Sequence, residues 1–363
     1  MSAALSGPAK SVGQGMRSGV EAYFQLVNER GGIHGRKLRL IPLDDGYEPA
    51  QAARNVHKLL DDEKVFALLG NTGTPTAAVV VPIIQAQHVP FFGAYTGEGL
   101  LRKSPPDRYV INFRASYALE TQEMVRGLTR EAGIKPSEIA FFTQNDAYGD
   151  AGFAGGMKAL RAIGVSDPER QLHGRYTRNT VDVEGAVAQM LDPSVSPKAV
   201  IMVGAVKPCA KFIKLMRKYG YRGLFVNVSF VNADALLDEL GAKDAEGVIV
   251  TQVVPPIDSD LPGVAEFRER VKAEQRSYVV LEGFLAAKAF CEGLRLGPPD
   301  LTADQFIDAF EGTGKIELGL GTQFWISPTD HELSEDVWPT IVRAGKFRAL
   351  RTWKDAVVGG RVG

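Results

Sequence analysis

The sequence is poor in cysteine and histidine. It contains two cysteines, Cys209 and Cys291, in 363 residues, and neither belongs to a CxxC motif. Its five histidines are scattered, so no Cys/His cluster has the spacing of a metal site. Two cysteines also cannot build the dense disulfide framework of small secreted domains. We therefore expect no metal, no cofactor and no disulfide scaffold.

Long apolar runs and an excess of one charge are missing as well. No apolar stretch approaches the ~20 residues of a transmembrane helix. Residues 1–8 lack the basic and apolar parts of a signal peptide. Lys and Arg number 42 against 43 Asp and Glu, which gives a net charge of −1. A nearly neutral protein has no general attraction for nucleic acid or an anionic membrane, so we expect no nucleic-acid partner.

What the sequence does contain is a repeated alternation of strands and helices. The chain is long enough for two domains, and 45% apolar with 23% charged residues is typical of globular proteins. Short apolar segments alternate with amphipathic ones, and the plan repeats in a second half. This pattern predicts an α/β fold with two doubly wound, Rossmann-like lobes. We predict strands at 38–43, 66–69, 89–92, 109–114, 139–142, 199–203, 224–227, 248–251 and 323–326, strands with a hairpin turn at Ala344–Gly345 within 340–347, and helices at 13–31, 49–61, 120–131, 208–219, 264–274, 279–296 and 303–311.

The turn that follows residues 66–69 is the first candidate binding site. Gly70–Gly73 combines two glycines with two short polar side chains, and Thr74 with Pro75 is typical of an N-cap and a first helical residue. Backbone N–H groups at a helix N-terminus bind carboxylates and other small anions. A second polar turn, residues 93–98, follows the next predicted strand. The alternative is an ordinary strand–helix turn without a ligand.

Aromatic residues also follow predicted strands, at Tyr95, Tyr148 and Phe230. The carboxyl ends of parallel strands are where α/β folds bind ligands. These rings therefore indicate a ligand-binding edge in each lobe. Packing at the rim of the sheet is the alternative interpretation.

Three glycines, Gly13, Gly15 and Gly19, offer a weak dinucleotide-binding motif. Their spacing departs from GxGxxG, and only a short apolar segment precedes them. Asp44 and Asp45 follow about 30 residues after Gly13, instead of the ~20 typical of that motif. We expect Asp45 to cap the following turn. No nucleophile and base stand in a known motif, so an oxidoreductase is the least favoured hypothesis and we expect no enzyme.

Motifs along nearly the whole chain occur together in one known family. They are Leu5–Pro8, Gly13–Gly15, Ala22–Phe24, Asn28–Gly35, Asp44–Asp45, Gly73–Thr76, Pro90–Gly93, Gln144–Gly149, Asn227–Val231 and Leu281–Phe284. On these motifs the sequence resembles the branched-chain amino-acid-binding (Leu/Ile/Val-binding) proteins, the type I periplasmic substrate-binding subunits of ABC transporters. The resemblance is specific for the family and much less specific for the ligand.

The resemblance implies two α/β lobes joined by three crossovers, with a ligand cleft between them. The N-terminal lobe is expected at 1–117 plus 252–326, and the C-terminal lobe at 118–251 plus 327–363. The absence of a linker agrees with this division. Cys209 and Cys291 then fall in different lobes, so we expect both thiols to be unpaired.

The resemblance also implies the ligand-binding residues. The turn that receives the ligand carboxylate matches Asn71, Thr72 and Gly73. The segment that holds the carboxylate and the amino group matches Ala94, Tyr95 and Thr96. Lobe closure over the ligand is expected to depend on Tyr148 and Phe230.

The sequence departs from the family at two site positions. Ser229, beside Phe230, stands where branched-chain amino-acid binders have a glutamate for the ligand's ammonium group. Val12 stands where they have a tryptophan, which would leave room for a bulkier ligand. A buried ammonium needs a carboxylate partner. Either Asp146 or Glu98 takes that role, or the ligand has no amino group.

The resulting hypothesis is an extracytoplasmic solute receptor, a monomer in the periplasm. It would bind a small carboxylate, a branched-chain or aromatic amino acid, and deliver it to the permease of an ABC importer. A ligand-sensing domain of the same fold is the alternative. The family's export signal and complete first strand are absent, so we expect a shortened chain or an upstream start.

Overall fold

A computed structural model describes residues 1–358, which divide into two compact units. Unit 1 comprises Met1–Ala115 and Val254–Asp336, and unit 2 comprises Ser116–Val253 and Val337 onward. The first two crossings lie within two residues of the expected positions, and the third lies ten residues later. The reason is local: Asn112 donates to the His331 carbonyl and accepts from the Leu333 amide, at 2.9 Å each, which keeps this segment with unit 1.

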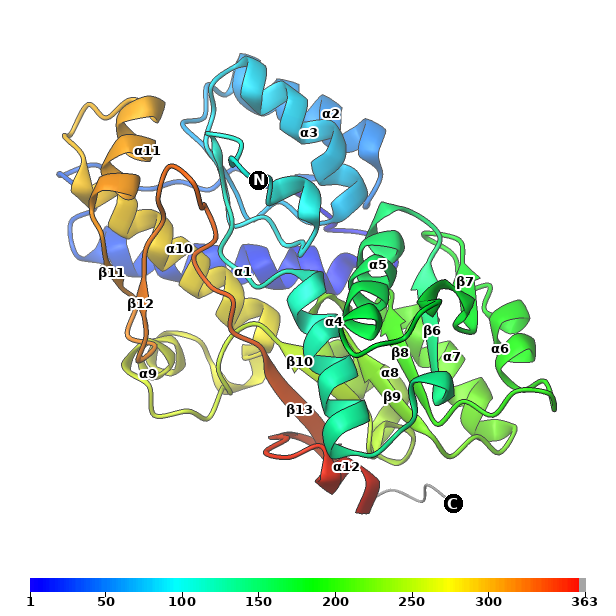
Figure 1. Cartoon of the computed structure of the whole chain (residues 1–363). Helices are drawn as coiled ribbons and strands as arrows, with labels where there is room; N and C mark the ends of the chain where they lie inside the picture. The colour runs from blue at the N-terminus through cyan, green and yellow to red at the C-terminus, as the bar shows by residue number, and fades with distance from the viewer. Residues whose placement is uncertain (359–363) are drawn as a thin grey trace. The chain divides into compact units, whose positions relative to one another are not determined.

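Unit 1 is built on short parallel strands (Figure 1). A three-stranded parallel sheet has the order β3-β4-β5, and β1 pairs in parallel with β2. The antiparallel pair β11–β12 lies near the third crossing. The strands are β1 (Ser2–Ala3), β2 (Leu43–Asp44), β3 (Leu68–Leu69), β4 (Phe91–Phe92), β5 (Val110–Ile111), β11 (Ile316–Glu317) and β12 (Gln323–Phe324). The helices are α1 (Lys10–Glu29), α2 (Pro49–His57), α3 (Thr74–Ala86), α9 (Pro262–Arg270), α10 (Tyr278–Leu296) and α11 (Ala303–Gly312).

The strand predicted at 38–43 is wrong over most of its length. Only Leu43 and Asp44 form β2, because the paired strand β1 faces just these two residues. The other predicted strands of unit 1 are likewise shorter than expected. The helix predicted at 49–61 is α2 followed by a π-helical turn at Lys58–Asp62.

The glycines of the weak dinucleotide motif lie inside α1 and serve packing. A Cβ on Gly13 would come within 2.1 Å of the Ala4 carbonyl oxygen, and one on Gly19 within 2.1 Å of the Val280 carbonyl oxygen. On the facing helix α10, a Cβ on Gly283 would come within 2.5 Å of the Met16 carbonyl oxygen. Helices α1 and α10 therefore pack backbone to backbone, and no phosphate-binding loop forms here.

Unit 2 contains a seven-stranded sheet of order β14-β13-β10-β9-β8-β6-β7. Strands β6 to β10 are parallel, and β13 and β14 add an antiparallel edge. Helices α4 and α5 pack together on one face and α7 and α8 on the other (Figure 1). The strands are β6 (Ile139–Gln144), β7 (His173–Tyr176), β8 (Ala199–Val203), β9 (Leu224–Asn227), β10 (Ile249–Gln252), β13 (Trp338–Arg343) and β14 (Lys346–Ala349). The helices are α4 (Tyr117–Arg126), α5 (Ala147–Ala162), α6 (Glu184–Met190), α7 (Val206–Lys218), α8 (Ala233–Ala245) and α12 (Lys354–Val358).

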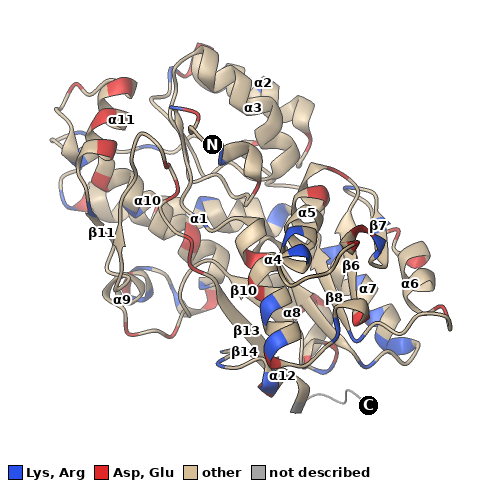
Figure 2. Cartoon of the chain, in the orientation of Figure 1, with Lys and Arg blue, Asp and Glu red and all other residues tan. Residues whose placement is uncertain are grey.

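Apolar residues fill the cores of the two units, and charged residues of both signs lie on their surfaces. Every residue of β6 and β8 is buried, as the continuous apolar runs predict for strands covered on both faces. Basic and acidic side chains are interspersed over both units (Figure 2), in line with the near-zero net charge. Within residues 1–358, no helix combines the length and apolarity needed to cross a membrane. Cys209 and Cys291 are buried and unpaired, as predicted.

Candidate ligand-binding site

The Asn71–Gly73 turn joins β3 to α3 in unit 1. Gly73 has a φ of +103°, and a Cβ there would come within 2.2 Å of the Tyr47 ring, so only glycine fits. Thr74 is already helical, which makes Gly73 the N-cap and the prediction of Thr74 as N-cap wrong. The Thr76 hydroxyl donates to the Thr72 and Gly73 carbonyls, at 2.5 and 2.9 Å, and so fixes the turn from behind.

The second turn, Ala94–Thr96, lies directly beside the first. The Tyr95 amide donates to the Asn71 carbonyl at 2.7 Å, and the Gly73 amide donates to the Tyr95 carbonyl at 3.2 Å. The hydroxyls of Thr74 and Thr96 are 2.6 Å apart and fully buried. The structure therefore brings the residues predicted from both turns together. It adds Thr74, whose side chain the sequence analysis had used only as a cap.

The side chains of the first turn have divided roles. The Thr72 hydroxyl accepts from the Ala4 amide at 2.9 Å, and Asn71 Oδ1 accepts from the Ser2 amide at 3.2 Å, which ties the turn to β1. This bond fixes the orientation of the Asn71 amide, since only Oδ1 can accept. Asn71 Nδ2 is buried and meets no acceptor among residues 1–358. A buried N–H donor without a partner is costly, and a ligand oxygen would satisfy it.

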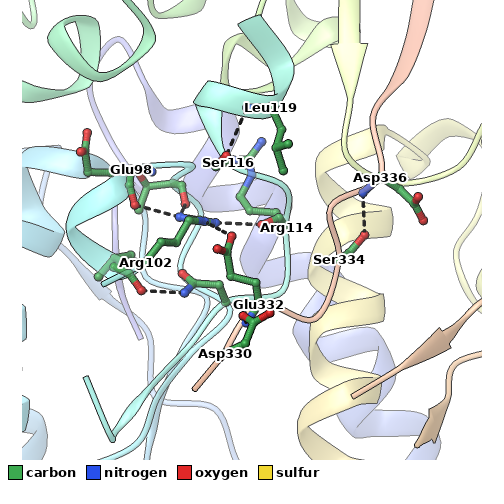
Figure 3. A network of polar contacts seen from close by, with 12 residues as sticks. Glu98, Arg102, Arg114, Ser116, Leu119, Asp330, Glu332, Ser334 and Asp336 are labelled. Carbon is green, nitrogen blue, oxygen red and sulfur yellow. Dashed lines mark hydrogen bonds and ion pairs between the residues drawn. The ribbon is translucent and has the colours of Figure 1, made fainter. Parts of the chain in front are cut away.

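The side chain of Arg102, which is almost fully buried, holds the second turn by hydrogen bonds to backbone carbonyls (Figure 3). The Arg102 guanidinium donates from Nη1 to the Glu98 carbonyl at 2.9 Å and from Nη2 to the Arg114 carbonyl at 2.8 Å. A longer Nη1 bond of 3.4 Å reaches the Thr96 carbonyl. Its Nε lies 2.7 Å from Glu332 Oε2, and burial raises the pKa of that carboxyl despite the neighbouring charge. Arg102 thus fixes the turn to the ends of unit 1's chain segments at 114 and 332.

Tyr95 packs against a second buried arginine in the same unit. The Arg114 guanidinium carbon lies 4.3 Å from the centroid of the Tyr95 ring, within the range of a cation–π contact. Arg114 Nε is 3.5 Å from Glu282 Oε1, and both side chains are almost fully buried. The ring of Tyr95 is therefore held in place by unit 1 itself. Val12, in the first turn of α1, is also buried in the structure.

In unit 2 the predicted aromatic residues form one cluster. The ring centroids of Tyr148 and Phe230 are 4.5 Å apart, and those of Tyr148 and Tyr117 are 5.2 Å apart. Tyr148 is the second residue of α5, and Asp146 caps this helix by accepting from the Tyr148 amide at 3.0 Å. The Tyr148 hydroxyl donates to the Gly204 carbonyl at 3.4 Å. Sequence analysis found two of the three rings and missed Tyr117.

Ser229 contacts an acid that sequence analysis did not consider. Glu120 of α4 is fully buried and accepts from the Ser229 amide at 2.7 Å and from the Ser229 hydroxyl at 2.8 Å. It also accepts from the Thr251 hydroxyl at 2.5 Å. The sequence contained an indication that Glu120 is buried, because Glu120 shares the apolar face of α4 with Met124, one turn away. An acid on such a face needs buried partners.

Of the two acids proposed for the ammonium group, Asp146 uses its carboxylate for other partners. Asp146 accepts from Gln144 Nε2 at 2.7 Å and lies 3.7 Å from Arg178 Nη1; burial raises its pKa. Glu98 accepts from Arg102 Nη1 at 2.9 Å through its backbone carbonyl, and this bond does not involve its carboxylate. Asp45 caps its turn as predicted, accepting from the Tyr47 amide at 2.9 Å, and burial raises its pKa to about 6. Among the residues described, no group of three or more His, Cys, Asp or Glu could hold a metal ion.

Two α/β units, one with polar turns and one with an aromatic cluster after its strands, indicate a ligand-binding protein. The chain belongs to the periplasmic binding protein family, whose model matches residues 1–346. The predicted α/β fold and the family resemblance are thereby confirmed. The family consists of binding proteins and not of enzymes, and nothing supports the oxidoreductase hypothesis.

The chain is also similar to individual proteins that are named as binding proteins for amino acids. A solved structure of a possible leucine/isoleucine/valine-binding protein from Rhodopirellula baltica SH 1 is 43% identical, with a TM-score of 0.93 over 98% of this chain and 96% of that one. The Leu/Ile/Val-binding protein homolog 7 of Brucella abortus is 23% identical over 88% of this chain and 83% of its own length. An amino acid binding protein of Pseudomonas aeruginosa is 25% identical over 68% of this chain, and the match spans only 64% of that relative.

Proposed function

We propose that this protein is an extracytoplasmic receptor that binds a small amino acid for an ABC importer. The observation that carries the proposal is the pair of turns in unit 1. They place the buried Asn71 Nδ2 and the Thr74–Thr96 hydroxyl pair at the N-terminus of α3. Hydrogen-bond donors at a helix N-terminus favour a ligand carboxylate, which accepts hydrogen bonds and benefits from the helix dipole.

Unit 2 supports an apolar ligand side chain. Its predicted site residues Tyr148 and Phe230 form, with Tyr117, a cluster of three rings. Aromatic faces contribute large apolar area and favour branched or aromatic ligand groups. Val12, where the resembling family has a tryptophan, leaves room for the larger of these side chains. The names of the relatives from Rhodopirellula baltica and Brucella abortus support a leucine, isoleucine or valine class.

The transport role follows from the family and extends the proposal. A monomeric receptor in the periplasm would present its ligand-bound form to the permease subunits of the importer. The similarity to Leu/Ile/Val-binding proteins supports this role.

A thermal-shift screen tests the function. The purified chain is heated with each of the proteinogenic amino acids and with aromatic carboxylates. A ligand at 100 times its Kd stabilises the folded state by about 2.7 kcal/mol, which raises Tm by roughly 5–11 °C for units of this size. We expect a shift with leucine, isoleucine, valine or phenylalanine. No shift with any amino acid or carboxylate would refute the proposal.

A further inference from the structure

Unit 1 contains a groove between two extended segments of the chain. Residues 37–41 and residues 65–69 line a cavity of about 480 Å³, and its apolar walls include Phe24 of α1 and Phe290 and Leu294 of α10. In the described part of the chain, β3 pairs with β4 alone and β2 pairs with β1 alone. The groove is therefore bordered on both sides by strand edges that face no neighbouring strand.

Strand β1 shows the path that a strand takes between these two segments. On one side, the Leu43 amide donates to the Met1 carbonyl at 3.0 Å. On the other side, the Thr72 amide donates to the Ser2 carbonyl at 3.4 Å. Strand β1 thus lies between the chain that forms β2 and the chain that follows β3. The groove, which Met1 also lines, continues this path.

The segment before β2 has its backbone oriented for strand pairing. Leu38 faces α1, because its amide and its carbonyl each form a bond of 2.8 Å with the Asn28 side chain. Backbone groups of an extended chain point alternately to opposite sides, so those of Arg39 and Ile41 face the groove. Their amides donate no hydrogen bond within residues 1–358. An edge of this kind is a template for another strand.

The segment that leads into β3 presents the same kind of edge. The Leu68 amide donates to the Pro90 carbonyl at 2.8 Å, so Leu68 uses its backbone on the side of β4. By the same alternation, the backbone of Ala67 faces the groove, and its amide donates no hydrogen bond among the described residues. Both borders therefore offer backbone donors to the same space.

The nitrogen of Met1 lies on this path. It donates to the Ile41 carbonyl at 3.1 Å, as a strand parallel to residues 41–44 does at this register. Burial lowers the pKa of this amino group to about 5, because a buried charge loses its solvation. A neutral peptide N–H makes the same bond without that cost. The position therefore suits a nitrogen in the interior of a strand.

We propose that the groove binds one further parallel β-strand, an apolar polypeptide segment that is joined to the Met1 nitrogen. About five residues at ~3.3 Å each span the length of the groove. The segment bonds to the backbone of Ile41 on one side and of Ala67 on the other, and its apolar side chains pack on α1 and α10. The inference does not depend on the proposed function. It also accounts for the alternation at 38–43, which predicts a strand longer than β2.

The same strand supports the first turn of the candidate site. The amides of Ser2 and Ala4 donate to the side chains of Asn71 and Thr72, at 3.2 and 2.9 Å. A longer strand at this position fixes β1 more firmly, and β1 in turn holds the Asn71 and Thr72 side chains.

Two extended variants of the full chain test the proposal. Five residues are placed before Met1, either Thr-Val-Thr-Ile-Val or Gly-Ser-Gly-Ser-Gly. Both replace the amino group by a peptide N–H, so the difference between them reports the strand. We expect the Val/Ile variant to have a Tm higher by about 5 °C or more. The amides of Arg39, Ile41 and Ala67 should exchange hydrogen about tenfold more slowly in it. Equal Tm values and equal exchange rates would overturn the proposal.

Arg39→Pro is the matched change within the groove. It removes one N–H that the strand needs, at a residue whose side chain is exposed. It should abolish most of the gain in the Val/Ile variant and change the Tm of the Gly/Ser variant by less than about 2 °C. An undiminished gain would show that the added residues do not pair here and would refute the proposal.

A free peptide distinguishes a joined strand from a separate chain. The peptide Thr-Val-Thr-Ile-Val, added in equimolar amount to the parent protein, should leave Tm unchanged, because it lacks the high effective concentration of a joined segment. A rise equal to that of the Val/Ile variant would show that the groove accepts a strand from another molecule. That result would contradict the proposed connection to Met1.

Discussion

Arg102 and Glu332 form a partly buried ion pair in unit 1, with Arg102 Nε 2.7 Å from Glu332 Oε2. The pair joins the segment after the second turn to the segment before the third crossing between units (Figure 3). Because the same guanidinium also holds the carbonyls of Glu98 and Arg114, the turn and both chain segments share one support.

Replacing Arg102 should therefore loosen the second turn. Arg102→Met leaves Glu332 without its buried partner and should cost about 3 kcal/mol of the free energy of unfolding. Arg102→Lys should rescue only part, because an ammonium cannot reproduce the planar set of bonds. Urea unfolding and hydrogen exchange of the amides of residues 94–102 measure the effect. The control is Arg39→Met, whose exposed ion pair should contribute less than about 1 kcal/mol. Equal stability of the two variants would contradict this role for Arg102.

The hydroxyl of Thr96 should contribute directly to binding. Thr96→Val keeps the shape of the side chain and removes the partner of Thr74. If the hydroxyl pair faces the ligand carboxylate, binding should weaken by about 1–3 kcal/mol. Calorimetry with the amino acid found in the screen measures this change. Binding equal to that of the parent would show that the pair serves only the fold.

Thr74 and Glu120 show what the sequence could and could not predict. The alternation of strands and helices was sufficient for the α/β class, and the motifs were sufficient for the family. The bond between Thr74 and Thr96 was hidden, because it depends on two turns more than 20 residues apart meeting side by side. Glu120 was missed because an acid on a helix is usually solvated, although its place on the apolar face of α4 with Met124 indicated burial. The strand at 38–43 was overpredicted, since alternation shows which face is apolar but not where a partner strand lies.

Tyr148 should control the release of the ligand. Tyr148→Ala removes the ring that packs on Phe230 and on Tyr117. We predict lower affinity, mainly through faster dissociation, because the lost contact acts in the ligand-bound state. Stopped-flow fluorescence separates the two rate constants. Tyr148→Phe, which keeps the ring and removes the hydroxyl that donates to the Gly204 carbonyl, is the matched control. An unchanged dissociation rate in Tyr148→Ala would exclude Tyr148 from the site.

His173 should make stability depend on pH. Burial lowers the pKa of its imidazole to about 4. The ring stacks on Phe153 with centroids 4.0 Å apart, and its Nε2 lies 2.8 Å from the Thr143 hydroxyl. The unfolded chain binds a proton near pH 6.5, and the folded chain only near pH 4. Stability should therefore fall as pH drops from about 6.5 to 4 and level off below that range. Thermal unfolding across this range should show a shallower dependence in His173→Gln. An identical slope in the variant would exclude His173 as a source of the dependence.

The central claim is that the turns of unit 1 bind the carboxylate of a small amino acid. Calorimetric titration of the parent protein with leucine or phenylalanine, whichever the screen selects, and with the corresponding amino-acid amide tests it most directly. The amide keeps the ammonium group and the side chain but removes the negative charge. We predict one molecule of amino acid bound per chain and affinity for the amide at least tenfold weaker. Equal affinity for the two compounds would contradict the claim.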